Sequence, residues 1–228
     1  MDHYSYINEN YLALSRYIRE AEEKYSRSIT LVCVTKSGTD EELLALAAAG
    51  ATDVGENRPT ELARRGKLMR EAGYTPNLHE IGNLQRNKVK YIIRDVALIH
   101  SLDSLTLAEE IEKQAAKIDR TVPVLIEINS GREENKGGIM PEDAEQFFLK
   151  LREYPHLRVK GLMTMGPVCE SEEARKYFRL TKQLYDLIGK KWGYDGEGIL
   201  SMGMSDSYEV AIEEGSTLVR VGRRLFTK

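Results

Sequence analysis

Short apolar runs alternate with amphipathic stretches along the whole chain. Eight runs are rich in apolar and β-branched residues and end in polar or glycine-rich residues: 29–35, 51–57, 77–83, 96–101, 122–129, 159–165, 198–205 and 217–222. The first, ITLVCVT, is almost continuously apolar, which is typical of a strand buried on both faces of a parallel sheet. The pattern therefore predicts eight strands separated by helices.

Apolar residues between these runs recur at helical spacing. One stripe in the first 26 residues consists of Ile7, Tyr11, Leu14, Ile18, Ala21 and Tyr25. Thr39 and Glu42 have the spacing of a capping box, which starts a helix, and Gly50 can end that helix. Further helices are predicted at 108–118, 141–151 and 171–192.

Eight strand–helix units without a linker or repeat favour a single parallel (β/α)8 TIM barrel over residues 1–228, with an additional N-terminal helix. A doubly wound parallel sheet is the alternative, and the count of eight favours the barrel. The sequence has no GxGxxG motif after a first strand and no P-loop pattern, which argues against the common nucleotide-binding sheets.

Composition narrows the function classes. The 228 residues carry a formal net charge of -3, so no basic excess predicts nucleic acid or an anionic membrane as a partner. No apolar run approaches the roughly 18 residues of a membrane span, and the polar start MDHYSYINEN lacks the pattern of a signal peptide. Two cysteines, Cys33 and Cys169, make no disulfide framework, so we expect a cytoplasmic protein.

Candidate chemistry lies where the predicted strands end, which is the active face of such barrels. Lys36 follows the first strand and is either a solvated charge or a nucleophile. Ser201, Ser205 and Gly222 follow the last two strands, where hydroxyls and unobstructed backbone N–H groups can bind a phosphate. Because strand eight would close against strand one, Lys36 would face this phosphate site, as a pyridoxal phosphate site requires.

Arg220 lies inside an apolar strand, which predicts that its side chain points into a polar barrel mouth or pairs with an acid. His79 and His100 are single residues that match no metal-ligand spacing. The sequence thus predicts no metal site, and spacing alone assembles no Ser-His-Asp set.

Several motifs carry a resemblance to a known family: VTKSG, GENR, IGNLQRNK, IHSLD, INSGREENKGG, GLMTM, LSMGMSDSYEVAI and TLVRVGRRLF. In this order, from Lys36 to Phe226, they resemble the YggS/PROSC family of pyridoxal phosphate homeostasis proteins. GENR, LSMGMS and VRVG are the most specific of them.

The resemblance implies a fold similar to the N-terminal barrel of bacterial alanine racemase. It implies a Schiff base between Lys36 and pyridoxal phosphate, Arg220 near the pyridine nitrogen, and Asn57 beside the cofactor. The phosphate contacts that it implies are Ser201, Ser205 and Gly222.

Three positions depart from the family pattern. Leu78 precedes His79 where the family often has tryptophan, and Glu80 follows it where phenylalanine is common. Gly38 stands where a second lysine is usual. If that lysine helps to hand over the cofactor in relatives, the handover differs here.

We therefore expect a monomeric pyridoxal phosphate carrier that buffers the cofactor or delivers it to apo-enzymes that depend on it, without strong catalysis. Arg220 would donate to the pyridine nitrogen and leave the ring a weak electron sink. The sequence also ends soon after the predicted eighth strand, without the second domain that racemases of this fold use. A weak amino-acid racemase and a cofactor-free phosphometabolite-binding barrel are the alternatives.

Overall fold

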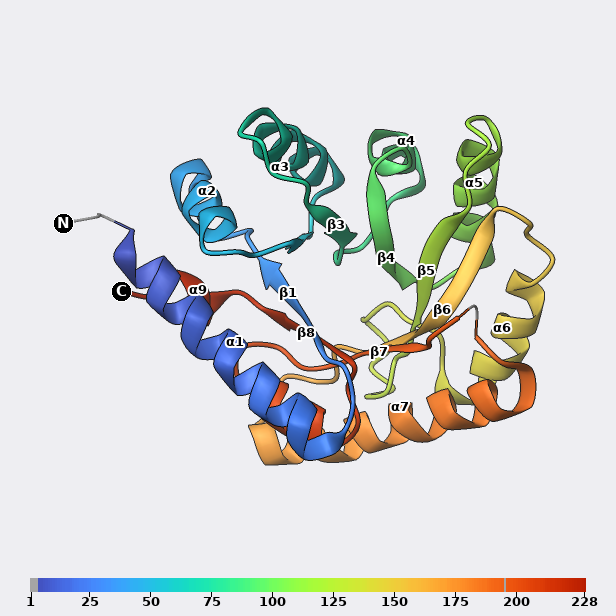
Figure 1. Cartoon of the computed structure of the whole chain (residues 1–228). Helices are drawn as coiled ribbons and strands as arrows, with labels where there is room; N and C mark the ends of the chain where they lie inside the picture. Colours follow the sequence, from blue (N-terminus) through green and yellow to red (C-terminus); the bar gives the residue numbers. More distant parts are fainter. Residues whose placement is uncertain (1–3, 195) are drawn as a thin grey trace.

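The computed structural model describes residues 4–194 and 196–228. Within these residues, eight parallel strands close into a barrel in the order of the sequence, with β8 beside β1 (Figure 1). The predicted (β/α)8 barrel is confirmed, and the doubly wound sheet is wrong. The helix predicted over the first 26 residues is confirmed from Ser5, whereas residues 1–3 lie outside the described part of the chain.

Most strands are shorter than their apolar runs. They are β1 (Thr30–Val34), β2 (Asp53–Glu56), β3 (Asn77–Glu80), β4 (Val96–Leu102), β5 (Val122–Glu127), β6 (Leu157–Met163), β7 (Ile199–Ser201) and β8 (Leu218–Val221). The largest difference is at β7, where 198–205 was predicted, because Gly203 turns the chain away with a φ of 89°. The polar residues at the ends of the runs therefore form the loops of the barrel rim.

Helices follow the strands. They are α1 (Ser5–Tyr25), α2 (Asp40–Ala48), α3 (Pro59–Glu71), α4 (Val89–Ile92), α5 (Leu105–Ala116), α6 (Ala144–Leu151), α7 (Ser171–Trp192), α8 (Tyr208–Glu213) and α9 (Arg223–Phe226), with short 3-10 helices at Arg86–Lys88 and Pro141–Asp143. The capping box of Thr39 and Glu42 is confirmed at the start of α2. Ile118, predicted on the apolar face of a helix, lies just beyond the end of α5.

The core has two layers, as the alternation of side chains across barrel strands requires. Inside the barrel, one apolar cluster contains Val32, Leu98, Leu125, Met163 and Leu218. Outside it, the opposite faces of the strands pack against the helices in larger clusters. None of the helices in the described part of the chain combines the length and the hydropathy needed to cross a bilayer.

The N-terminal helix covers the seam where the barrel closes. Its buried Ile7, Leu14 and Ile18 belong to the same cluster as Cys33 of β1 and Val219 of β8. The Asn10 amide of α1 also donates to the Thr227 carbonyl, over 2.9 Å. The elements nearest the two chain ends therefore fix the β1–β8 edge, beside the loop that carries Lys36.

Candidate functional site

Lys36 lies in the loop between β1 and α2, at the C-terminal rim of the barrel. Its side chain is exposed, whereas Thr35 before it is fully buried. A tight turn follows, because the Gly38 N–H donates to the Thr35 carbonyl over 2.9 Å. The structure thus places an amine on the rim where the sequence predicted it.

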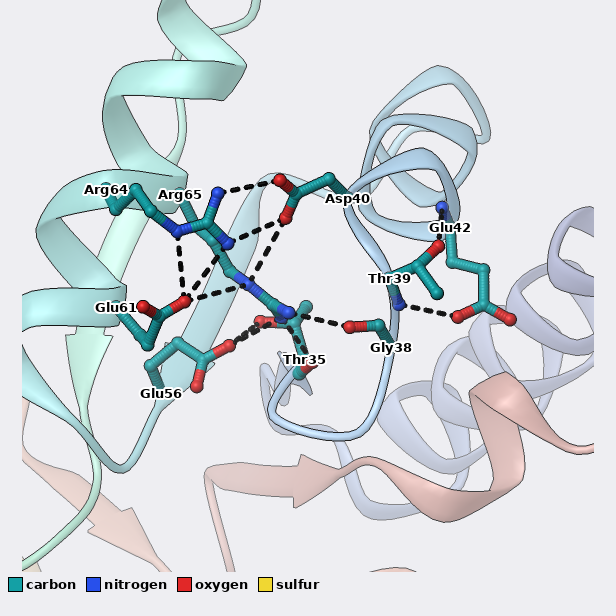
Figure 2. A network of polar contacts seen from close by, with 9 residues as sticks. All are labelled: Thr35, Gly38, Thr39, Asp40, Glu42, Glu56, Glu61, Arg64 and Arg65. Carbon is teal, nitrogen blue, oxygen red and sulfur yellow. Dashed lines mark hydrogen bonds and ion pairs between the residues drawn. The ribbon is translucent and has the colours of Figure 1, made fainter.

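A buried arginine on α3 holds this turn in place. Arg65 donates through Nη1 to the Thr35 carbonyl and through Nη2 to the Gly38 carbonyl, the latter over 2.6 Å. Figure 2 shows the guanidinium reaching from α3 to the loop. Both ends of the turn around Lys36 are therefore fixed by one side chain.

The same arginine connects the loops after β1 and β2. Arg65 Nη1 lies 2.7 Å from Glu56 Oε1, and the Thr35 hydroxyl donates to that oxygen over 2.6 Å (Figure 2). Glu56 is the last residue of β2, and the exposed Asn57 follows it directly. The predicted site residues Lys36 and Asn57 thus lie on loops that share one buried ion pair.

An exposed ion pair fixes the far end of the Lys36 loop. Both terminal nitrogens of Arg64 lie 2.7 Å from the Asp40 carboxylate, which opens α2. The hydrogen bonds from Arg64 hold the pKa of Asp40 below its ordinary value. Because both side chains are exposed to solvent, this pair contributes less to stability than the buried pair of Arg65 and Glu56.

Two glycines allow close packing around these loops. A Cβ at Gly38 would lie 2.6 Å from the Phe226 ring, so the aromatic side chain of α9 fills the space that a side chain at position 38 needs. A Cβ at Gly82 would lie 2.7 Å from the Cα of Asn57. The Phe226 ring therefore leaves no room for a lysine at position 38. The Asn57 backbone packs closely against Gly82 in the loop after β3.

Ser205 and Gly222 come together at the ends of β7 and β8. The Gly222 N–H donates to the Ser205 hydroxyl over 3.2 Å. A Cβ at Gly222 would lie 3.0 Å from the Val34 carbonyl oxygen, so the end of β8 packs directly on the end of β1. This pair of polar groups is consequently beside the loop of Lys36.

Arg220 points into the barrel, as predicted. It is 3% exposed and donates through Nη1 to the Ser201 hydroxyl and through Nη2 to the Thr164 carbonyl, the latter over 3.1 Å. Burial lowers its pKa to about 10, and Glu127 opposes this shift. The guanidinium therefore remains protonated at neutral pH. The structure places Ser201 beneath Arg220, whereas Ser205 lies on the rim with Gly222.

A chain of polar side chains inside the barrel was not predicted from the sequence. His79 and His100 were expected to be isolated, but His79 Nδ1 lies 3.0 Å from His100 Nε2. His79 Nε2 is also 2.9 Å from Asp53 Oδ1, and His100 Nδ1 is 3.1 Å from Ser201 Oγ. Part of a signal was available, because each histidine directly follows an outward-facing apolar residue, Leu78 or Ile99, on neighbouring strands, which predicts that both rings face inward.

Two acids near the rim, the buried Glu80 and the half-buried Glu127, were also missed. Burial raises the pKa of Glu80 to about 8, and Glu56 adds to the shift, whereas a hydrogen bond from the Gly82 N–H opposes it. Burial raises the pKa of Glu127 to about 7, with Asp103 adding to the shift and Arg220 opposing it. In the described part of the chain, no set of three His, Cys, Asp or Glu side chains is placed to hold a metal ion.

Comparisons with known proteins agree with this geometry. The sequence model of the family described as alanine racemase, N-terminal domain, matches residues 10–227. The pyridoxal phosphate homeostasis protein of Aquifex aeolicus is 42% identical over 197 residues, which cover 86% of this chain and 85% of that protein. The protein of the same name from Helicobacter pylori (strain ATCC 700392 / 26695) is 36% identical over 220 residues, covering 94% and 95%.

Solved structures give the same result. PipY of Synechococcus elongatus, whose structure has pyridoxal phosphate bound, superposes with a TM-score of 0.85 at 25% identity, covering 97% of this chain and all of that one. Alanine racemase of Clostridium difficile shares the fold alone, with a TM-score of 0.73 at 18% identity over 96% of this chain and 56% of the racemase. The chain therefore belongs to the family of pyridoxal phosphate homeostasis proteins, built on the barrel of the alanine racemase N-terminal domain.

Proposed function

We propose that the protein binds pyridoxal 5'-phosphate reversibly and buffers it or delivers it to apo-enzymes that depend on it. The observation that carries the proposal is the meeting of Ser205, Gly222 and the Lys36 loop where β8 packs on β1. An anion-binding pair of groups and a primary amine thus lie on adjacent strand ends, which matches a ligand that carries a phosphate and an aldehyde.

The pair of Ser205 and Gly222 would bind the phosphate. The Ser205 hydroxyl accepts a hydrogen bond from the Gly222 N–H, and its own hydrogen can rotate toward a ligand. An incoming phosphate oxygen can accept from the Ser205 hydroxyl and can replace that hydroxyl oxygen as the acceptor of the Gly222 N–H, which gives short charge-assisted hydrogen bonds.

Lys36 and Arg220 would hold the rest of the cofactor. Pyridoxal phosphate supplies an aldehyde, which condenses with a lysine amine and releases water. Arg220, whose guanidinium stays charged, donates hydrogen bonds and leaves its protons in place. A ring nitrogen facing such a donor remains unprotonated, which favours holding the cofactor over catalysing carbanion chemistry with it.

Titration of the purified protein with pyridoxal phosphate tests the proposal. We expect the wild-type protein to develop the absorbance band of a lysine-bound aldehyde, and Lys36→Ala to lack it. Lys67→Ala is the matched control, because that lysine is exposed on α3, away from the rim. An unchanged band in Lys36→Ala would reject Lys36 as the anchor.

Two measurements on the same purified protein distinguish the alternative functions. An amino-acid racemase would exchange the Cα hydrogen of an added amino acid for deuterium with turnover. A phosphometabolite-binding barrel would leave the spectrum of added pyridoxal phosphate unchanged.

A further inference from the structure

Five polar side chains form one continuous chain across the inside of the barrel. They come from β2, β3, β4, β7 and β8 and are Asp53, His79, His100, Ser201 and Arg220. Asp53 lies at the start of β2, beside a small cavity of about 210 Å³ at the N-terminal end of the barrel. Arg220 lies toward the opposite end, where the candidate site is. The chain therefore joins the two ends of the barrel.

His100 in this chain is neutral at physiological pH. It is fully buried, and burial, His79 and the charge of Arg220 all lower its pKa, to well below its ordinary value. Its imidazole therefore has one N–H and one lone pair. His79, which is 4% exposed, contacts the Nε2 atom of His100 through Nδ1.

Asp53 decides which nitrogen carries the hydrogen. Burial alone would raise the pKa of Asp53, but hydrogen bonds from His79 and Thr52 lower it, so its carboxylate is ionised at neutral pH and accepts hydrogen bonds. His79 then carries hydrogen on Nε2, and the order of donors inferred here has its Nδ1 accept from His100 Nε2. By the same rule, His100 donates through Nε2 and presents the lone pair of Nδ1 to Ser201.

The order of donors continues to the arginine. The Ser201 hydroxyl donates to His100 Nδ1, so its oxygen lone pairs remain available to Arg220 Nη1. In the opposite arrangement, with a hydrogen on His100 Nδ1, the serine hydrogen would lose this buried acceptor, which costs about 1–3 kcal/mol. In one arrangement every contact of the chain is a hydrogen bond, and each residue donates to the next one in the direction from Arg220 to Asp53.

We propose that His79 and His100 are positioning residues for Arg220: anchored by Asp53, they keep Ser201 oriented as the acceptor that fixes the guanidinium inside the barrel. The inference rests on the function proposed above, because it concerns how that site holds the arginine that meets the cofactor. It predicts that Asp53, which lies at the far end of the barrel, influences the cofactor site.

Nitrogen NMR of labelled imidazole rings tests the arrangement in the cofactor-free protein near neutral pH. We expect His79 and His100 both to be neutral and to carry hydrogen on Nε2. Asp53→Leu removes the acceptor, so His79 should shift to a mixture of tautomers. Hydrogen on Nδ1 of either ring in the wild-type protein, or a charged ring, would overturn the proposal.

Affinity for pyridoxal phosphate tests whether this positioning of Arg220 matters for the cofactor site. His100→Leu removes the acceptor of Ser201, and we expect binding to weaken about tenfold, as for loss of a hydrogen bond to a charged group. His100→Asn keeps an acceptor oxygen near the position of Nδ1, so its affinity should stay within about threefold of the wild type, a difference below 1 kcal/mol. Equal weakening in both variants would contradict positioning and indicate a packing role.

His156→Leu is the control. This histidine also pairs with an acid, since its Nδ1 lies 2.6 Å from Glu112 Oε1 of α5, but it lies in the loop between α6 and β6, before the strand enters the barrel. We expect its removal to leave affinity unchanged. If the wild-type protein bound no pyridoxal phosphate, the proposed function would fail and the affinity consequence with it, and the tautomers seen by NMR would still decide whether the hydrogen-bond order is right.

Discussion

Two buried arginines, Arg65 and Arg220, lie on either side of the strands at the barrel rim and are held in different ways. Arg65, on α3 outside the barrel, reaches toward the strand ends and pairs with the Glu56 carboxylate (Figure 2). Arg220 faces the interior, and its hydrogen-bond acceptors, Ser201 and the Thr164 carbonyl, are neutral. Both residues are at most 7% exposed. The two sites thus share a buried guanidinium and differ in whether its charge is neutralised by direct contact.

This difference suits Arg65 to holding the fold and Arg220 to binding a ligand. The charge of Arg65 is compensated by Glu56, and its hydrogen bonds hold backbone carbonyls, so it fixes a loop. Arg220 is held by dipoles, and Glu127 acts on it only through a longer-range electrostatic interaction. A buried cation without a directly bonded anion is costly to the fold, and such a cost is typical of a group kept for a ligand.

Replacing Arg65 by methionine should have the largest effect on stability. Arg65→Met keeps most of the volume but leaves the buried Glu56 carboxylate without its cation. We expect the free energy of unfolding to fall by about 3 kcal/mol, measured by urea denaturation. Arg64→Met, which removes the exposed pair with Asp40, should lower it by less than about 1 kcal/mol. Equal losses in the two variants would contradict the assignment of Arg65 as the anchor.

Two neighbouring buried acids, Glu56 and Glu80, differ in the same way: within the described part of the chain, Glu56 pairs with an arginine and Glu80 does not. Glu80 is the register partner of Glu56 on the neighbouring strand, but its Oε2 is buried without a hydrogen-bond partner in the described residues. Its pKa is raised from 4.5 to about 8, so folding favours the protonated form. This stability is fully present below the unfolded pKa and is lost as the pH rises through the folded one.

Glu80→Gln should therefore flatten the dependence of stability on pH. We expect the wild-type protein to lose stability between these two pKa values, and the variant to be more stable by about 2 kcal/mol at the alkaline end. Glu134→Gln, at an exposed acid, is the control. Parallel pH profiles for the wild type and Glu80→Gln would show that Glu80 is ionised in the folded state.

Arg220→Met should have the opposite balance of effects to Arg65→Met. It removes a desolvated cation and leaves neutral acceptors, so we expect the free energy of unfolding to change by less than about 1 kcal/mol or to rise. Affinity for pyridoxal phosphate should fall by about tenfold, because a charged donor is lost. Denaturation and absorbance titration of one preparation measure both quantities. A large loss of stability with unchanged affinity would reverse the roles of the two arginines.

The smallest expected effect lies in the loop that Arg65 holds. Gly38→Ala brings a Cβ within 2.6 Å of the Phe226 ring, which should lower the free energy of unfolding by about 1 kcal/mol. Phe226→Leu in the same chain should recover part of this loss, and Phe226→Leu alone gives the reference for a double-mutant cycle. Additive losses would show that the two positions are independent.

The fold could be predicted from sequence because its pattern is local. Each strand is an apolar run such as ITLVCVT, each is followed by an amphipathic stretch, and eight such units have one common closed arrangement. Strand ends were predicted less well, as at Gly203, because a single glycine with positive φ ends β7 inside an apolar run.

The site could be predicted only in part. Lys36, Ser205 and Gly222 follow strand ends, so the barrel alone brings them to one rim. The chain through His79 and His100 depends on which interior positions of separate strands meet across the barrel, and the spacing along the sequence carries no record of that. The role of Arg65 was missed for the same reason, since its acceptors are mainly backbone carbonyls of a distant loop.

The meeting of β1 with β8 also has a consequence for synthesis. Lys36 precedes Ser205 and Gly222 in the sequence, so it is synthesised before them. A nascent chain therefore has the amine long before it has the anion-binding groups, and the two meet only when the final strand docks. Under the proposed function, tight retention of the vitamer would therefore report that β8 has docked on β1, and chains truncated before β8 would not withdraw it from the cellular pool.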